Sequence, residues 1–408
     1  MESGTNKMKI VWICGFTNTL VQSKMSLLKS SDDTAPWISN LLKLFENCGS
    51  IELHVISPHF FMNKPKESFV IHGITYHFFR IGAPFFLGRW PSWIPLDFFI
   101  NHYFLRKAIE KEVNEISPNL IHLHGMENSF HSFTIINLMN QYKIFVTPQG
   151  FLHLIPNKRN YIIDKRVANE LFLTKKLKYF SYRNSYIKEV ISKLNPEATF
   201  FYHDYIVKPE INIVSSFRPK LYDLCFFGRV SHAKGVFDFL EVVSILKKSQ
   251  PNLSALIIGG VDKNCLAELQ LRCKVLEIND NIKLQGFIDK RSDLHELVAQ
   301  CKISLLPSHV DMIPGTIIES MQLKTAVVSY DIGGISDLKK VNNIISLSNL
   351  GDFDHLAIDC LQLLTNEMYY NKRVACAYEY AAHRWGGKGV YLDIVNAYKE
   401  IIHPKNNI

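Results

Sequence analysis

The sequence has 408 residues, 47% of them hydrophobic and 21% charged, which is a globular composition and a length that favours two domains. Its formal net charge of +8 suits an anionic small molecule or a membrane surface, and no block of like charges indicates a nucleic-acid-binding tail. No uninterrupted apolar stretch reaches the ~18 residues of a membrane-spanning helix, and the polar start MESGTNKMK lacks a signal-peptide core.

The eight cysteines form no Cys-x-x-Cys pair, and several of them stand in apolar runs such as VWIC and LCFF. We therefore expect buried free thiols in a reducing compartment rather than a disulfide framework. This favours a cytoplasmic protein.

The first half of the chain alternates between strand-like and helix-like segments. Strands are expected at 9–15, 51–58, 120–125 and 143–150, helices at 36–49 and 104–116, and a hairpin at 68–81 that turns at His72-Gly73. Alternation of this kind predicts an α/β fold with a parallel sheet that is covered by helices on both faces.

The second half repeats the pattern after a seam within 205–220, where two prolines interrupt any periodicity. Strands are expected at 223–230, 254–260, 282–287, 303–308 and 326–331, and helices at 236–249, 262–276, 293–300 and 316–324. The sequence thus predicts two α/β domains.

Ligands of open α/β sheets bind beyond the carboxyl ends of the strands, so the residues after each strand are the candidates for a site. The loop GRVSHAKG carries Arg229 and Lys234 between two glycines, and these two cations could neutralise a diphosphate beside a helix N-terminus. A solvated basic loop is the plain alternative.

The segment DMIPGTIIESM follows another strand and holds two carboxylates, Asp311 and Glu319. We expect the helix to begin near Gly315 or Thr316, which would place Glu319 in its first turn, where it could bind vicinal hydroxyls. The alternatives are a turn residue at Asp311 and ordinary complementation of the helix dipole at Glu319. The loops GGVD and IGGISD add further glycine-rich strand exits.

These motifs resemble the retaining family four of nucleotide-sugar glycosyltransferases, also described as glycosyl transferases group 1. The resemblance rests on GRVSHAKG, on the acidic pair Asp311 and Glu319, on GGISD and on the ending HRWGGKGVYLDIVNAYKEII. It implies the GT-B fold: two Rossmann-like domains that face each other across a cleft, with a C-terminal helix crossing back to the first. The domains would be 1–210, completed by 385–408, and 211–384.

The resemblance also implies roles for single residues. Arg229 and Lys234 would hold the donor diphosphate, Glu319 the ribose hydroxyls and Asp311 the transferred sugar, where Asp stands in place of the usual Glu. Other donor-site candidates flank the strand exits: Gly15, Gly228, Gly260, Phe287, Pro314, Gly315, Thr316, Gly333 and Gly334. Many relatives carry a histidine where TPQGFLH has Gln149, so Gln149, the nearby His153 and His124 are the acceptor-side candidates.

No metal and no cofactor is expected, and the nucleotide-sugar is a substrate. The Asp-x-Asp motif at Asp352 and Asp354 precedes a helix without a strand before it, which indicates helix-start acids. His122 and His124 face the same side of one strand and could bind zinc, but with no acidic or Cys partner nearby a structural role or an acceptor contact is favoured. Arg229, Lys234 and helix N-termini would instead stabilise the charge that develops on the diphosphate.

The leading hypothesis is a retaining hexosyltransferase that builds a surface polysaccharide, such as a lipopolysaccharide or capsule, on a saccharide or lipid-linked acceptor. An epimerase or phosphorylase of the same architecture, or a non-catalytic nucleotide-sugar-binding subunit, is the alternative. Segment 81–105 is rich in aromatic residues next to cations, including Trp90, Trp93, Phe99 and Phe104. It could rest on an anionic membrane at the cytoplasmic face or pack within the first domain.

Overall fold

The computed structural model describes residues 7–29, 34–81, 98–155, 160–209 and 219–404. The chain divides into two compact units, which are described separately below. Unit 1 is Met1–Ile206 together with Gly387–Ile408, and unit 2 is Val207–Gly386. Most of the aromatic segment expected to meet a membrane, including Trp90 and Trp93, lies outside the described residues.

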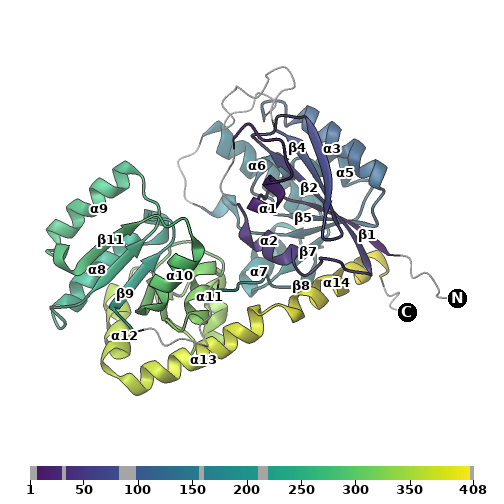
Figure 1. Ribbon diagram of the computed structural model, residues 1–408. Helices are drawn as coiled ribbons and strands as arrows, with labels where there is room; N and C mark the ends of the chain where they lie inside the picture. Colours follow the sequence, from purple (N-terminus) through teal and green to yellow (C-terminus); the bar gives the residue numbers. More distant parts are fainter. Residues whose placement is uncertain (1–6, 30–33, 82–97, 156–159, 210–218, 405–408) are drawn as a thin grey trace. The chain divides into compact units, whose positions relative to one another are not determined.

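Unit 1 is built on an eight-stranded sheet in the order β3-β4-β2-β1-β5-β6-β7-β8 (Figure 1). All neighbouring pairs are parallel except β3 and β4, which form the hairpin predicted from His72-Gly73. The strands are β1 (Met8–Ile13), β2 (Ile51–His59), β3 (Lys66–Ile71), β4 (Ile74–Arg80), β5 (Leu120–His124), β6 (Ile144–Thr147), β7 (Tyr179–Tyr182) and β8 (Thr199–Tyr202).

The helices of unit 1 connect these strands and cover the sheet (Figure 1). They are α1 (Thr19–Gln22), α2 (Pro36–Leu42), α3 (Tyr103–Ile116), α4 (Ser129–Ser132), α5 (Ile135–Leu138), the 3-10 turn η2 (Leu152–Leu154), α6 (Tyr161–Lys176), α7 (Ser185–Leu194) and α14 (Lys388–Ile402). The helix expected at 36–49 ends at Leu42, and the apolar residues after it continue as turns. Phe45 is still buried, so apolar periodicity at this point reflects packing rather than helix.

The last helix of the chain, α14, completes the core of unit 1. Val390, Ile394 and Ile401 belong to the same buried cluster as the residues of β1 and β2. The hydroxyl of Tyr398 accepts a hydrogen bond of 2.8 Å from Trp12 Nε1 and lies 2.6 Å from His122 Nδ1. A buried Tyr needs such partners for its hydroxyl. The C-terminal residues therefore form part of the first unit.

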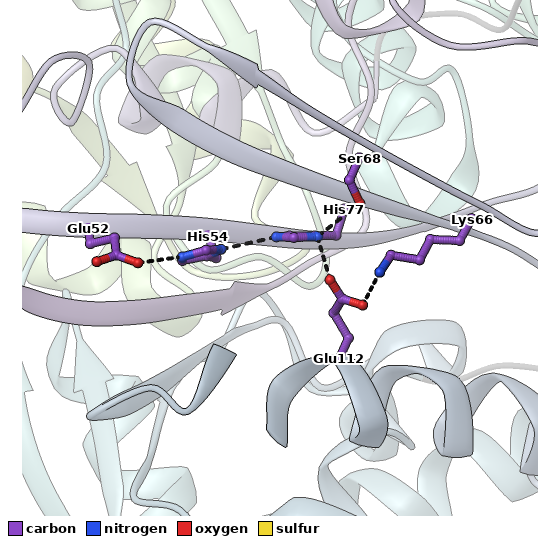
Figure 2. Close-up of polar contacts among 6 residues, drawn as sticks. All are labelled: Glu52, His54, Lys66, Ser68, His77 and Glu112. Atoms are coloured by element: carbon purple, nitrogen blue, oxygen red, sulfur yellow. Dashed lines mark hydrogen bonds and ion pairs between the residues drawn. The ribbon is translucent and has the colours of Figure 1, made fainter. Parts of the chain in front are cut away.

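A polar network joins the hairpin to α3 (Figure 2). Two adjacent imidazoles lie between two carboxylates: His54 contacts Glu52 and His77 at 3.0 Å each, and His77 contacts Glu112 at 2.7 Å. Lys66 forms an ion pair with the same Glu112 carboxylate. Because its members come from β2, β3, β4 and α3, the network fixes the position of α3 against the edge of the sheet.

Unit 2 has a six-stranded, fully parallel sheet in the order β11-β10-β9-β12-β13-β14. The strands are β9 (Tyr222–Phe227), β10 (Ala255–Ile258), β11 (Ile282–Gly286), β12 (Cys301–Leu306), β13 (Ala326–Tyr330) and β14 (Ser346–Ser348). The helical elements are η3 (His232–Lys234), α8 (Val236–Lys247), α9 (Lys263–Val275), η4 (Asn279–Asn281), α10 (Arg291–Ala299), α11 (Gly315–Gln322), η5 (Gly333–Lys340), α12 (Phe353–Thr365) and α13 (Glu367–Trp385).

Both faces of this sheet are covered, as the continuous apolar runs of its strands predict. On one face, Phe226 and Leu305 join a buried cluster with residues of α8 and α12. On the other, Ser320 of α11 donates a hydrogen bond of 2.8 Å to the hydroxyl of Ser304 in β12. Phe227, which points away from Phe226, is 2% exposed. Because all strands of this sheet are parallel, their carboxyl ends lie at one edge of the sheet.

All eight cysteines are free, and six of them are buried. Burial raises the pKa of the Cys14 thiol above its usual range, because it disfavours the thiolate, and burial together with the charge of Asp359 does the same at Cys360. Among the described helices, none combines the length and apolar character needed to cross a membrane.

Candidate functional site

A cavity of about 740 Å³ lies at the carboxyl edge of the sheet in unit 2. It is lined by the residues that follow three neighbouring strands, β9, β10 and β11, together with α10 and α11. This is where ligands of open α/β sheets bind. We call it the unit-2 cavity.

Two glycines allow the loops around this cavity to approach closely. Gly259 has φ +151°, and a Cβ atom there would lie 1.7 Å from the carbonyl oxygen of Gly228. Gly235, at the start of α8, has φ +76°, and its Cβ would lie 1.8 Å from the carbonyl oxygen of Pro307. Any other residue at either position would push the loops apart.

The loop after β9 is held against its neighbours by hydrogen bonds. Val230 N donates to Gly260 O at 3.0 Å, and His309 N donates to Ala233 O at 3.0 Å. Further out, the Asp238 carboxylate accepts hydrogen bonds from the Tyr330 hydroxyl at 2.8 Å and from His309 Nε2 at 2.9 Å. The cation-bearing loop is therefore fixed on both sides.

Glu319 lies inside α11 and not at its start. The helix begins at Gly315, has no acidic residue in its first turn and is preceded by Pro314. The expectation that Glu319 stands in the first turn is therefore wrong. As the fifth helical residue it points back along the helix into the unit-2 cavity. Helix-dipole complementation therefore does not explain this carboxylate.

Arg291 forms an ion pair with Glu319 at the wall of the unit-2 cavity. His295, one turn further along α10, places Nε2 3.8 Å from the other Glu319 oxygen. The Glu319 side chain is 6% exposed and that of Arg291 is 38% exposed. A carboxylate offers about four acceptor positions, so Glu319 can keep its contact with Arg291 and still bind two ligand hydroxyls.

Lys234 and Asp311 form a second ion pair, between the loops that follow β9 and β12. The Lys234 side chain is 38% exposed and that of Asp311 is 13% exposed. Asp311 Oδ1 also accepts a hydrogen bond of 3.0 Å from Met312 N. The carboxylate is therefore fixed, while the ammonium group remains accessible to a ligand.

The structure brings most, but not all, of the donor-site candidates to the unit-2 cavity. Those that line it are Gly228, Arg229, Gly260, Phe287, Gly315, Thr316 and Glu319. Lys234, Asp311, Pro314, Gly333 and Gly334 belong to unit 2 but are not lining residues, and Gly15 belongs to unit 1. Their roles stay predictions.

The acceptor-side candidates lie in unit 1. His124 is 2% exposed and packs against Trp12, with ring centroids 4.4 Å apart. His153 Nδ1 is 2.6 Å from a carboxylate oxygen of Glu170, which is fully buried and also accepts a hydrogen bond of 2.8 Å from Leu152 N. His153 is thus paired within the unit. The side-chain nitrogen of Gln149 is buried without a hydrogen-bond partner among the described residues.

Asp352 and Asp354 stand at the start of α12, as predicted. Asp352 is its N-cap and accepts a hydrogen bond of 3.0 Å from His355 N, while Asp354 lies in the first turn. His122 and His124 lie side by side, with ring centroids 3.8 Å apart. Within the described ranges, no group of three His, Cys, Asp or Glu side chains is placed to hold a metal ion.

Sequence reasoning did not single out Arg291 or His295. The available signal was the segment GFIDKRSDL, in which a basic pair follows a strand exit and opens a helix. The expected helix began at 293, whereas α10 begins at Arg291. Those two residues of helix bring the guanidinium group to Glu319.

Residues 207–382 match the family described as Glycosyl transferases group 1. A curated relative from Campylobacter jejuni is 26% identical over 226 residues, or 52% of this chain: GalNAc-alpha-(1->4)-GalNAc-alpha-(1->3)-diNAcBac-PP-undecaprenol alpha-1,4-N-acetyl-D-galactosaminyltransferase. The match spans 61% of that relative's length.

Two solved structures are similar over nearly the whole chain. A sucrose-phosphate synthase from Thermosynechococcus elongatus has a TM-score of 0.72 at 13% identity and covers 97% of this chain and 99% of its own. Anabaena HepE, in complex with UDP and glucose, has a TM-score of 0.65 at 13% identity and covers 96% of this chain and all of its own. At this identity the likeness shows the fold, which is the GT-B architecture.

Proposed function

We propose that this chain, whose residues 207–382 match the glycosyl transferases group 1 family, transfers a sugar from a nucleotide-diphosphate donor to a saccharide or lipid-linked saccharide. The observation that carries the proposal is the unit-2 cavity, in which Arg229, the start of α11 and Glu319 converge. A cation, free helix N–H groups and a buried carboxylate are what a nucleotide-sugar requires.

We propose that the donor binds this cavity in one orientation. Glu319 accepts hydrogen bonds from the vicinal ribose hydroxyls, and Phe287, which is 71% exposed next to Gly260, covers the base. The diphosphate then lies between Arg229 and the N-terminus of α11, with Lys234 and Asp311 at its sugar end. HepE was solved with UDP-glucose, so UDP-glucose is the first donor to test.

Cleavage of the sugar–phosphate bond leaves negative charge on the diphosphate and positive charge on the sugar ring. Backbone hydrogen bonds hold the loop that carries Arg229 and Lys234 before the reaction, and these cations and the α11 N–H groups stabilise the leaving diphosphate. Asp311 faces the sugar and stabilises its positive charge. We infer retention of configuration from the family alone.

A panel of nucleotide-sugars tests this proposal directly. We expect nucleoside diphosphate release from at least one donor, accelerated by an added saccharide acceptor. An epimerase would convert the sugar-nucleotide without releasing the diphosphate, and a binding subunit would bind it without turnover. Either result would overturn the transferase proposal.

We further propose that unit 1 receives a lipid-linked acceptor at the cytoplasmic face of a membrane. The Campylobacter jejuni relative is named for an undecaprenol-linked substrate. In the described part of the aromatic segment, Phe99, Ile100, Tyr103 and Phe104 are 51%, 50%, 46% and 43% exposed. Phe99 stacks on Tyr161, itself 57% exposed, with ring centroids 5.9 Å apart. Exposed aromatic groups of this kind suit a membrane interface.

Vesicle sedimentation tests the membrane contact. Anionic vesicles should bind the protein at low salt, and the double variant Phe99→Ser with Phe104→Ser should stay in the supernatant. The matched control is Leu271→Ser with Val275→Ser, because both residues are 62% exposed on α9 of unit 2. Equal sedimentation of all three proteins would overturn the membrane contact but leave the transferase proposal intact.

A further inference from the structure

Two carboxylates line the unit-2 cavity, and they differ in what they can still bind. Asp262 is the N-cap of α9: its Oδ1 atom accepts hydrogen bonds from Asn264 N at 3.0 Å and from Cys265 N at 2.9 Å. Asp262 is also exposed, so water competes for it, whereas the Glu319 side chain is 6% exposed. Among the described lining residues, Glu319 is therefore the carboxylate at which a ligand hydroxyl meets the least competition from water.

Arg291 fixes the Glu319 carboxylate through one of its two oxygens. The ion pair joins the guanidinium group to Glu319 Oε1. The same oxygen lies 3.7 Å from the position that a Cβ atom would take at Gly315, so the side chain folds back over the start of α11. Oε2 lies 3.8 Å from His295 Nε2, which is longer than a hydrogen bond. The carboxylate is thus held at Oε1, and Oε2 keeps acceptor positions for a ligand.

The ion pair also decides what Arg291 does not do. Arg229 and Arg291 both line the cavity, so either could in principle hold a diphosphate. Moving Arg291 onto a phosphate, however, would leave the buried Glu319 carboxylate without its counter-ion, which is strongly unfavourable. Arg291 therefore stays on Glu319, and it acts on a ligand through that carboxylate.

A carboxylate that is held in place discriminates between ligands better than a mobile one. A glutamate side chain is flexible, and an unheld carboxylate that loses one ligand hydroxyl can turn toward water. With Oε1 held by Arg291, the Glu319 oxygens cannot turn away, so a missing hydroxyl leaves a buried acceptor unpaired. Sites built in this way strongly reject an analogue that lacks the hydroxyl.

We propose that Arg291 is a positioning residue that holds Glu319 for a ribose with both of its hydroxyls, so that the unit-2 cavity takes ribonucleotide donors in preference to 2′-deoxyribonucleotide donors. This inference rests on the proposed function, because it places the donor's ribose at Glu319. It adds the class of donor and the residue that sets the preference.

Titration calorimetry on the full chain tests the preference with ligands that differ by one hydroxyl. The probes are UDP, GDP and ADP, each paired with its 2′-deoxy form, so that the base is matched within each pair. For the base that binds best, the ribonucleotide should bind at least about tenfold more tightly, the loss of one hydrogen bond to a charged group. Equal affinities within that pair overturn the proposal.

Two variants of Arg291 test its role as the residue that holds Glu319. In Arg291→Gln the ratio of ribonucleotide to deoxyribonucleotide affinity should fall to about threefold, because Glu319 can then turn. Arg291→Lys keeps the charge without the planar fork of donors, so its ratio should be intermediate. The matched control is Arg272→Gln, which breaks the pair with Glu241 outside the cavity; its side chain is 43% exposed, against 38% for Arg291. The control should keep the wild-type ratio.

The affinity ratio separates positioning from a purely structural role. Arg291→Gln leaves a buried carboxylate unpaired, so its melting temperature should fall whether or not Arg291 serves the ligand. A structural role, or a direct contact of Arg291 with the diphosphate, would weaken both members of a pair equally. An unchanged ratio in Arg291→Gln therefore overturns the proposal. If that variant does not fold, Arg291→Lys decides, and a wild-type ratio there overturns it.

A double variant shows whether Arg291 acts through Glu319. Glu319→Gln alone should bring the ratio close to one, because the charged acceptor is gone. Adding Arg291→Gln to it should not change the ratio further, since residues that act as one unit are not additive. A further fall in the ratio on adding Arg291→Gln would show that Arg291 contacts the ribose itself, and would overturn the positioning role.

The outcomes distinguish this inference from the proposed function. If ribonucleotides are preferred but no nucleotide-sugar is turned over, the positioning role stands and the transferase proposal fails. If a donor is turned over but both members of a pair bind equally, only this inference is overturned. If none of the six nucleotides binds, the donor cavity is overturned and this inference with it.

Discussion

The ammonium group of Lys234 forms an ion pair with the Asp311 carboxylate and so joins the loops that follow β9 and β12. Without a ligand, the positive charge of Lys234 is already compensated. If the donor binds as proposed, a diphosphate competes with Asp311 for Lys234, whereas the intact donor also offers sugar hydroxyls to Asp311 in exchange. We therefore expect the pair to favour the intact donor over the free diphosphate.

Replacing Asp311 by Asn should tighten the binding of nucleoside diphosphate and slow the transfer. Losing a partly exposed ion pair releases Lys234 for the phosphates, worth up to about 1 kcal/mol or roughly fivefold in affinity. Titration calorimetry and turnover with the best donor measure the two effects. Weaker diphosphate binding in D311N would contradict this role of the pair.

Replacing Glu319 by Ala should weaken donor binding by about 2 kcal/mol, roughly thirtyfold, because hydrogen bonds to a buried charge are lost and Arg291 is left without its partner. The matched control is Glu241→Ala, which breaks another Arg–Glu pair, that with Arg272, outside the unit-2 cavity. Donor affinity in E319A equal to that in E241A would place the ribose elsewhere.

Replacing Arg229 by Ala should reduce kcat more than it reduces nucleoside diphosphate affinity, because the charge on the diphosphate grows as the bond breaks. We expect a loss of about a hundredfold in rate. Arg272→Ala, on the surface of α9, is the control. An equal loss in rate and in diphosphate affinity would mean that Arg229 stabilises the bound ground state and the transition state equally.

Transfer should survive EDTA. The reason is that Arg229, Lys234 and the N-terminus of α11 already supply positive charge at the proposed position of the diphosphate. The rate is measured before and after chelation, and again after manganese is added. A rate abolished by EDTA and restored by manganese would show that these groups are insufficient.

Unit 1 should lose stability in mild acid. Burial lowers the pKa of His131 and of His203 to about 4, and it lowers the pKa of His122 and of His124 well below the ordinary value of 6.5. The folded form thus binds fewer protons than the unfolded chain. The contribution of these histidines to the free energy of unfolding is therefore complete above pH 6.5 and falls as the pH drops toward 4.

Glu127 acts in the opposite direction. Burial raises its pKa to about 7, so its contribution to the free energy of unfolding falls as the pH rises from 4.5 through 7. Burial also raises the pKa of Asp393, but the four histidines outnumber these two carboxyls. Urea unfolding followed by circular dichroism should give a lower midpoint at pH 5 than at pH 7.5. His203→Gln should narrow the difference, and His383→Gln, at an exposed position, should not. Equal wild-type midpoints at both pH values would contradict the effect.

The sequence was sufficient for the parts of the fold that depend on local pattern. Apolar runs ending in glycine marked the parallel strands, and His72-Gly73 marked the hairpin, because period and turn chemistry act over a few residues. Helix bounds were less well predicted: only the first half of 36–49 is helix, and α10 begins two residues before the expected start. Because the expected helix began at 293, Arg291 was not placed on it and was not predicted as the partner of Glu319.

The sequence predicted candidate site residues only where a single motif carried several charged side chains. GRVSHAKG and the Asp311–Glu319 segment were found, but the partner of Glu319 comes from a different strand exit, and no spacing in the sequence links the two.

The place of α14 has a consequence for how the protein is made. The hydroxyl of Tyr398 on α14 forms hydrogen bonds with both Trp12 and His122. The core of unit 1 therefore lacks one wall until α14 has been translated. Unit 2 can close earlier, since its cluster draws on no residue beyond Val374. The strands β1 and β2 must therefore wait, with apolar surface uncovered, until α14 has been made.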